Sequence, residues 1–182
     1  MGTRHLIAAR VNGEYKLAQY GQWDGYPSGQ GVKVLDFLKS KRNQTKLKKN
    51  LVDCSFIPEE ELEANWDSLL TEQPHLSRNT GAAILDYIAA GSRKLSNNIA
   101  FAADGLFCEF AYIIDFDKNT LEIFQGFNKE PLDKDERFFS MDKPTEVYDG
   151  SNYYAVKHLK TYPLTKLPTK NKFLSDLEHT ED

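Results

Sequence analysis

The residue pair Asn12-Gly13 stands between two extended runs in "RHLIAARVNGEYKLAQY", near the start of the chain. Asn-Gly favours a two-residue hairpin turn because both residues adopt positive φ angles at little cost. A second hairpin is predicted around residues 117–119, where two more extended runs meet in "LFCEFAYIIDFDKNTLEIFQGF". Any fold for this chain must therefore accommodate two antiparallel strand pairs that are far apart in the sequence.

Three helices are predicted in the segment between the hairpins. The first spans residues 29–40 and has Ser28 as its N-cap. The second begins after Pro58 with three glutamates in its first turn, and the third spans residues 80–90 and stops at Gly91. Apolar residues that recur at helical spacing are expected to be buried: Val32, Leu35 and Leu38; Leu62, Trp66 and Leu69; Ile84, Leu85 and Ile88.

The order of these elements predicts the fold class. A late strand, "YYAVKHLKTYPL", is expected to end at Pro163, because proline cannot donate to a strand ladder. Hairpin, helices, hairpin and late strand together indicate an α+β fold in which an antiparallel sheet is covered by helices. Residues 1–174 are predicted to form a single domain, and the acidic residues 175–182 a flexible tail.

Composition limits where in the cell the protein is expected to be and which partners it is expected to bind. No apolar run approaches the roughly 18 residues that a membrane span needs, and the N-terminal run is too short for a signal peptide. Two cysteines cannot form a disulfide framework, so a cytoplasmic location without a membrane partner is predicted. The net charge of −4 disfavours nucleic acid. The basic segment "KSKRNQTKLKK" lacks aromatic residues for base stacking and is predicted to be a solvated helix end and loop.

The stretch "AQYGQWDGYPSGQG", residues 18–31, combines three aromatic side chains with amide and carboxylate groups. Aromatic faces with a few oriented polar groups are what a ligand pocket requires. The alternative is an aromatic cluster that closes the end of the sheet, with the glutamines facing water. The backbone amides of residues 29–32 are a candidate anion site at a helix start, unless the glycines only permit a tight turn.

Candidates outside this loop lie on the predicted strands. Arg4 and His5 are adjacent, so they point to opposite faces and only one of them can reach a pocket at the loop. Glu109 is either buried and paired, part of a cavity wall, or at a sheet edge. Cys108 is predicted to be a core residue because it shares an apolar strand face with every second residue that follows it: Phe110, Tyr112, Ile114 and Phe116.

The predicted ligand-binding residues come from these regions and comprise Arg4, His5, Gln19, Tyr20, Gln22, Trp23, Asp24, Tyr26, Gln30, Gly31 and Glu109. No catalytic residue is assigned. The remaining histidines, His75, His158 and His179, show no metal-ligand spacing with either cysteine, so neither a metal nor a cofactor is expected. A small-molecule ligand is the predicted partner, and homo-oligomerisation is left open.

Two stretches of the chain resemble an uncharacterised family of small proteins found in phages, bacteria and fungi. They are "GTRHLI…G.YK.AQYGQWDGYPSGQG" and, later, "FCEFAYIIDFDKNTLEIFQGFNK". The resemblance covers most of residues 2–130, and "QYGQWDGYPSGQG" is specific to it. The family's distribution implies one setting: an anti-defence phage protein that sequesters a nucleotide immune signal of its host.

More distantly, the opening is similar to N-terminal-nucleophile amide hydrolases of the choloylglycine-hydrolase type. Those enzymes begin with a catalytic residue on a first strand, turn through a hairpin, and carry an Arg or Asp at the end of the second strand. The resemblance places Thr3 and Asp24 near these positions. Removal of Met1 would expose Gly2, which has no side chain to act as a nucleophile, so Thr3 would need a second cleavage.

Three functions follow from these observations. The first expectation is a non-catalytic protein that captures a small polar, nucleotide-derived ligand between the aromatic loop and the first strand. The second is an amide or phosphodiester hydrolase that uses Thr3, His5, Asp24 or Glu109. The third is a protein-interaction module, since exposed Trp and Tyr side chains also anchor protein partners. A concave loop favours the first, and a flat apolar surface around Trp23 favours the third.

Overall fold

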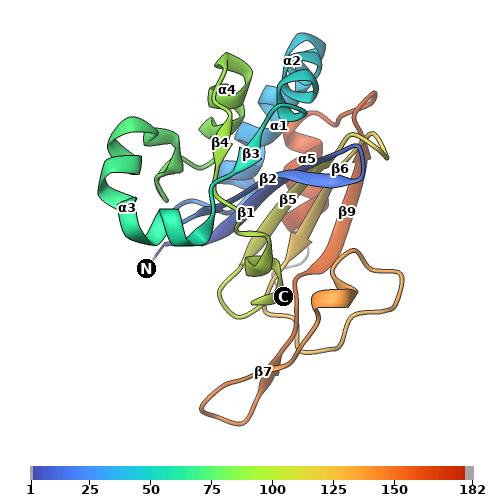
Figure 1. The fold of residues 1–182 in the computed structure, drawn as a ribbon. Helices are drawn as coiled ribbons and strands as arrows, with labels where there is room; N and C mark the ends of the chain where they lie inside the picture. The colour runs from blue at the N-terminus through green and yellow to red at the C-terminus, as the bar shows by residue number, and fades with distance from the viewer. Residues whose placement is uncertain (1, 179–182) are drawn as a thin grey trace.

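The structure is a computed structural model that describes residues 2–178 of the chain. Its centre is a five-stranded sheet with the strand order β2-β1-β5-β6-β9 (Figure 1). The strands of this sheet are β1 (His5–Val11), β2 (Glu14–Gly21), β5 (Phe110–Asp115), β6 (Thr120–Gln125) and β9 (Lys157–Pro163). With helices packed on the sheet, the predicted α+β fold is confirmed.

Both predicted hairpins are present, β1 with β2 and β5 with β6. Asn12 and Gly13 have φ angles of 54° and 78°, as the predicted turn requires. The carboxylate of Asp117, in the second turn, accepts hydrogen bonds from the backbone N–H of Asn12 at 2.8 Å and of Gly13 at 2.9 Å. The two turns are therefore bonded to each other at one end of the sheet.

The two hairpins lie side by side through β1 and β5, which are parallel and pair His5 with Phe110. The sheet is mostly antiparallel, as predicted, with this one parallel pair in its main ladder. A parallel pair needs a long crossover, which residues 22–109 supply. As a result, β1 and β5 begin where β2 and β6 end, and we call this the proximal end of the sheet.

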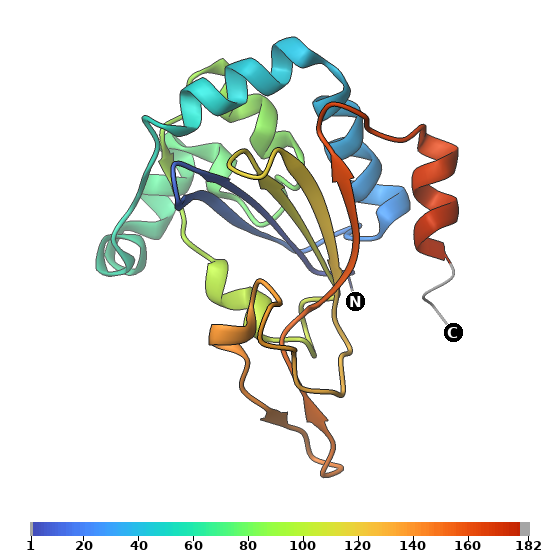
Figure 2. The ribbon, with the colours of Figure 1, turned by 90° about the vertical axis from the view of Figure 1, so that its right-hand side faces the viewer.

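Four helices cover one face of the sheet (Figures 1 and 2). They are α1 (Val32–Lys39), α2 (Lys41–Leu51), α4 (Ala83–Ala90) and α5 (Lys170–Glu178). One buried cluster joins them to the strands and contains Ile7, Leu17, Tyr112, Ile114, Ile123, Leu35, Leu38, Leu47, Leu51, Ile84, Leu85, Ile88 and Phe173. The predicted apolar stripes of the first and third helices are confirmed, and each fully buried side chain contributes roughly 1.5–3 kcal/mol.

The start of the first predicted helix needs correction. Pro27–Gly31 forms a π-helical turn, and α1 begins only at Val32. Ser28 lies inside that turn and no side chain caps α1, so the predicted N-cap is wrong. The basic segment forms α2, where Ser40 is the N-cap and its hydroxyl accepts a hydrogen bond from the backbone N–H of Asn43 at 3.2 Å.

Helix α3 (Glu59–Glu72) lies beside the sheet and begins after Pro58, as predicted. Its backbone departs from helical geometry at Asn65, where φ is −129° and ψ is 23°. Leu69 is buried, but Trp66 is 40% exposed, so the predicted buried stripe is wrong at Trp66. The break at Asn65 interrupts the helical period immediately before Trp66 and accounts for the difference.

The opposite face of the sheet is covered by η3 (Ile99–Ala103) and by residues 126–156. This long segment contains η4 (Phe139–Met141) and the small hairpin of β7 (Thr145–Glu146) and β8 (Asn152–Tyr153), which projects away from the sheet (Figure 2). The second buried cluster contains Leu6, Ala8, Ala18, Ala111, Ile113, Phe124, Leu132, Phe138, Val156 and Cys108. Cys108 is a core residue, as predicted, but it precedes β5 and packs on the face opposite to the predicted one.

Arg137 connects the long segment to this face of the sheet. Its guanidinium donates to the carboxylates of Asp115 at 2.5 Å and Glu122 at 2.6 Å, and to the hydroxyl of Tyr15 at 3.1 Å. Burial by itself raises the pKa of Asp115, but the hydrogen bonds from Arg137 and from the backbone N–H of Lys118 outweigh burial, and the pKa is lowered.

The C-terminal helix corrects the predicted tail. Residues 175–178 belong to α5, in which Phe173 and Leu177 are buried, and residues 179–182 lie outside the described residues. The remaining elements are the two-stranded parallel pair β3 (Ser55–Phe56) with β4 (Lys94–Leu95), and η2 (Pro74–Leu76). No helix within residues 2–178 is both long and apolar enough to cross a membrane.

Candidate functional site

A cleft of about 230 Å³ opens at the proximal end of the sheet, and we call it the sheet-end cleft. Segments that enter or leave four strands build it: those before β1 and β5 and those after β2 and β6. Its lining residues are Gly2, Thr3, Arg4, Tyr26, Leu106, Phe107, Glu109 and Phe127. The structure therefore brings together three of the predicted binding residues, Arg4, Tyr26 and Glu109.

Arg4 and Glu109 extend the parallel pairing of β1 and β5 by one step. The backbone N–H of Glu109 donates to the carbonyl of Arg4 at 3.1 Å, and the N–H of Arg4 donates to the Glu109 carboxylate at 2.9 Å. The Arg4 guanidinium lies over the ring of Phe107, 4.7 Å from its centroid, a cation–π contact. One carboxylate oxygen of Glu109 and the guanidinium N–H groups have no hydrogen-bond partner among the described residues.

Phe127 is held at the cleft by a close backbone crossing. Its N–H donates to the carbonyl of Gly105 at 2.5 Å, and the N–H of Gly126 donates to the carbonyl of Glu109 at 2.9 Å. A Cβ at Gly126 would lie 2.0 Å from the carbonyl oxygen of Cys108, so only glycine allows this approach. Phe127 itself has a φ of 55° and is 51% exposed.

Tyr26 forms a further wall and follows β2. The preceding residue, Gly25, donates its N–H to the carbonyl of Thr3 at 2.9 Å and accepts a hydrogen bond from the buried hydroxyl of Tyr112 at 2.7 Å. These bonds fix the backbone, yet the side chain of Tyr26 remains 48% exposed. Phe107 is 46% exposed, so three half-exposed aromatic residues line the cleft together with one arginine and one glutamate.

Of the two alternatives for the backbone amides of residues 29–32, the anion site is wrong, and the glycines permit a tight turn. The N–H groups of Gly29 and Gly31 donate to the carbonyl of Tyr26, at 2.9 Å and 3.2 Å, and the N–H of Gln30 donates to Asp24 at 2.7 Å. The N–H of Val32 donates to the carbonyl of Pro27. Gly31 instead leaves room for Tyr112, whose hydroxyl would be 2.9 Å from a Cβ at this position. The π-helical turn thus satisfies the amides that a helix start would leave free.

The predicted glutamines have structural roles. Gln19 is buried and donates from its amide to the carbonyl of His75 at 2.9 Å. Gln30 is buried and accepts from the N–H of Ala82 at 2.8 Å, which fastens the loop to α4. Gln22 accepts a 2.5 Å hydrogen bond from the hydroxyl of Tyr20. None of these residues lines the sheet-end cleft.

Trp23 and Asp24 also lie outside the lining of the cleft. The ring of Trp23 packs against Gly2 and is 46% exposed, and its Nε1–H donates to Asn79 at 2.8 Å. Asp24 has a φ of 56°, which lets its carbonyl accept the hydrogen bond from Gln30. The loop therefore contributes Tyr26 to the cleft, while Trp23 faces solvent beside it.

His5 points to the helix-covered face and is buried, with 1% of its surface exposed. Neither ring nitrogen has a hydrogen-bond partner among residues 2–178. A Cβ at Gly21 would lie 2.1 Å from the ring, so this glycine makes room for the imidazole. Burial lowers the pKa of His5 to about 4. Of the adjacent pair, Arg4 reaches the cleft and His5 does not.

Phe127 and Phe107 line the cleft but were not among the residues predicted from the sequence to bind a ligand. Both are aromatic residues at the ends of predicted strands, which is the available signal. Their meeting depends on the parallel pairing of β1 with β5, which places Arg4 beside Glu109. Pairing between segments so far apart in the sequence is not specified by local pattern.

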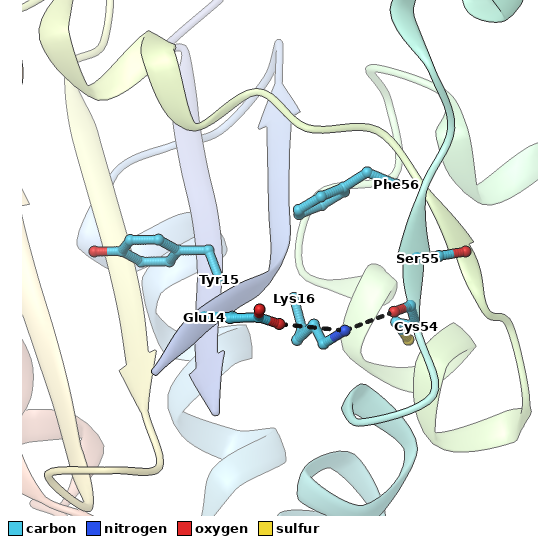
Figure 3. Close-up of a pocket in the computed structure, with 6 residues that line it drawn as sticks. All are labelled: Glu14, Tyr15, Lys16, Cys54, Ser55 and Phe56. Carbon is cyan, nitrogen blue, oxygen red and sulfur yellow. Dashed lines mark hydrogen bonds and ion pairs between the residues drawn. The ribbon is translucent and has the colours of Figure 1, made fainter. Parts of the chain in front are cut away.

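A second hollow, of about 500 Å³, lies at the start of β2 and contains Lys16, Cys54 and Phe56 (Figure 3). Lys16, the one cationic residue that lines it, already has partners. Its ammonium group donates to the carbonyl of Cys54 at 3.2 Å and lies 3.7 Å from the Glu14 carboxylate. Burial raises the pKa of the Cys54 thiol, which disfavours the reactive thiolate. This hollow therefore offers weaker binding chemistry than the sheet-end cleft.

Within residues 2–178, no group of three or more His, Cys, Asp or Glu residues is placed to hold a metal ion. The sheet-end cleft offers instead aromatic surfaces for stacking, the guanidinium of Arg4 and the carboxylate of Glu109. Comparison of the chain with protein-family models, with curated proteins and with solved structures finds no match.

Proposed function

We propose that the protein binds a purine nucleotide, or a molecule derived from one, in the sheet-end cleft and holds it without altering it. The observation that carries this proposal is that three half-exposed aromatic residues, Tyr26, Phe107 and Phe127, line one cleft with Arg4 and Glu109. Aromatic side chains bind planar bases by stacking, and such stacking contributes roughly 1–3 kcal/mol per base.

The two charged groups suit the edges of a purine. Arginine donates to the O6 and N7 acceptors of guanine, and a carboxylate accepts from an exocyclic amino group. Arg4 and Glu109 supply this donor and this acceptor within one cleft, and their fixed backbones limit the entropy lost on binding. The cleft volume of about 230 Å³ accommodates the base, while the sugar and phosphate extend into solvent.

Calorimetric titration with guanosine monophosphate and uridine monophosphate tests the proposal. We expect the purine to bind more tightly, because it stacks over a larger area and carries an amino group. Phe127→Ala should weaken its binding about tenfold or more. Phe139→Ala removes an exposed ring outside the cleft and should bind as the wild type does. Equal binding by both variants, or no binding to the wild type, would refute the proposal.

One observation favours a hydrolase as the second candidate: Thr3 lines the same cleft as Glu109. Threonine and glutamate are residue types that serve as a nucleophile and a base. The two functions differ in what is recovered after incubation with guanosine monophosphate or a dinucleotide. Binding alone returns the ligand unchanged by chromatography, whereas a cleaved product that disappears in Thr3→Ala would establish the hydrolase.

A further inference from the structure

A separate cleft of about 310 Å³ lies between α3, the end of β2 and the segment after β4. We call it the α3 cleft. Its apolar wall includes Leu62 and Trp66 of α3 and Leu76 of η2. Leu76 is buried in a small cluster with Leu69, so the wall has a fixed base. Above this base, Trp66 presents its ring to the cleft because the break at Asn65 turns it out of the buried stripe.

Three polar side chains of the α3 cleft keep donors without partners, whereas the hydroxyl of Tyr20, which also lines it, donates to Gln22. The guanidinium of Arg78 has no hydrogen bond or ion pair to another residue in the described part of the chain, although its carbonyl accepts from the N–H of Gln22 at 2.9 Å. Ser96 is 5% exposed, and its hydroxyl has no partner within residues 2–178. Asn98 uses its side-chain oxygen to accept from the N–H of Tyr20 at 3.1 Å, which leaves its NH₂ group to donate.

The charge of this lining differs from that of the sheet-end cleft. There, Arg4 is accompanied by Glu109, whereas no acidic side chain lines the α3 cleft beside Arg78. A half-exposed indole, an unpaired guanidinium and two further donors are complementary to a planar ring that carries a negative charge. Guanidinium binds both carboxylate and phosphate through paired N–H groups.

We propose that the α3 cleft is a second ligand site, which binds an aromatic molecule carrying one carboxylate or phosphate. The ring stacks on Trp66, and the anionic group accepts hydrogen bonds from Arg78 and Ser96. This site does not depend on the function proposed for the sheet-end cleft, because the two share no lining residue.

The tryptophan content of the chain allows a selective test. Trp23 and Trp66 are the two tryptophans, so Trp66 is the sole fluorescent indole in a Trp23→Phe protein. Phenyl phosphate and phenylacetate are each titrated against this protein. Phenol, which lacks the anionic group, and inorganic phosphate, which lacks the ring, serve as control probes. We expect a saturable change in Trp66 fluorescence with at least one of the two aromatic anions, and none with phenol or phosphate at the same concentrations.

Arg78→Ala in the Trp23→Phe background should weaken binding of the aromatic anion at least tenfold. The matched control is Arg42→Ala, which removes an exposed arginine from α2, outside the cleft, and should leave binding unchanged. Ser96→Ala provides a second, smaller change that should weaken binding severalfold. The proposal is overturned if neither aromatic anion binds, if phenol binds equally well, or if Arg78→Ala and Arg42→Ala bind alike.

Discussion

Replacement of Arg137 by alanine is expected to lower the free energy of unfolding by about 3–5 kcal/mol. The side chain of Arg137 is 7% exposed, and its guanidinium is the shared partner of Asp115 and Glu122, whose side chains are 1% and 10% exposed. Its removal leaves two carboxylates close together in a buried place without their cation. It also removes the ion pairs and hydrogen bonds by which Arg137 joins residues 126–156 to the sheet.

Urea unfolding of the wild type and of Arg137→Ala at neutral pH measures this effect. Lys157→Ala is the matched control, since Lys157 and Glu130 form an exposed pair at 3.7 Å and such pairs contribute about 0–1 kcal/mol. If Arg137→Ala lost no more stability than Lys157→Ala, the cluster would not hold the long segment to the sheet.

The second large effect is a loss of stability as the pH falls from above 6.5 to about 4. His5 is buried, and its pKa is lowered from 6.5 to about 4. The unfolded chain therefore takes up a proton in this window that the folded chain does not, which costs about 3 kcal/mol by its lower end. Asp115 acts at lower pH, because its lowered pKa stabilises the fold above 3.8 and that contribution is lost only below it.

Urea unfolding at pH 7.5 and pH 4.5 tests the role of His5. In His5→Asn the decrease in stability between these pH values should be smaller than in the wild type by about 2–3 kcal/mol, even if the variant is less stable overall. His158→Asn removes an exposed imidazole and should retain the full decrease. An unchanged decrease in His5→Asn would show that the imidazole takes up its proton in the folded protein.

Local sequence pattern was sufficient for the elements that depend on neighbouring residues. Asn12 and Gly13 adopt the positive φ angles of the predicted turn, and Gly91 ends α4 with a φ of 124°. Trp66 departs from its local pattern, because one non-helical residue, Asn65, shifts it out of the buried stripe. The parallel pairing of β1 with β5 was not predictable, since its crossover spans residues 22–109 and leaves no local signal.

The sequence predicted the kinds of residue that line the candidate site better than it predicted which residues meet there. The loop of residues 18–31 does reach the site, through Tyr26, but its glutamines and glycines serve the fold. Gln30 joins the loop to the start of α4 by a hydrogen bond from the N–H of Ala82. The backbone N–H groups of residues 29–32 all donate to carbonyls within the loop. A polar side chain in a loop has the same sequence signal whether its partner is a ligand or a backbone carbonyl. Arg4 and Glu109 became neighbours only through the parallel pair.

Binding of a purine nucleotide in the sheet-end cleft is tested most directly by amide chemical-shift changes in ¹⁵N-labelled protein titrated with guanosine monophosphate. Shifts are expected to concentrate on residues 2–4, 26, 106–109 and 126–127, and inorganic phosphate alone should not produce them. Absence of shifts, or shifts confined to the basic helix α2 and equally produced by phosphate, would contradict it.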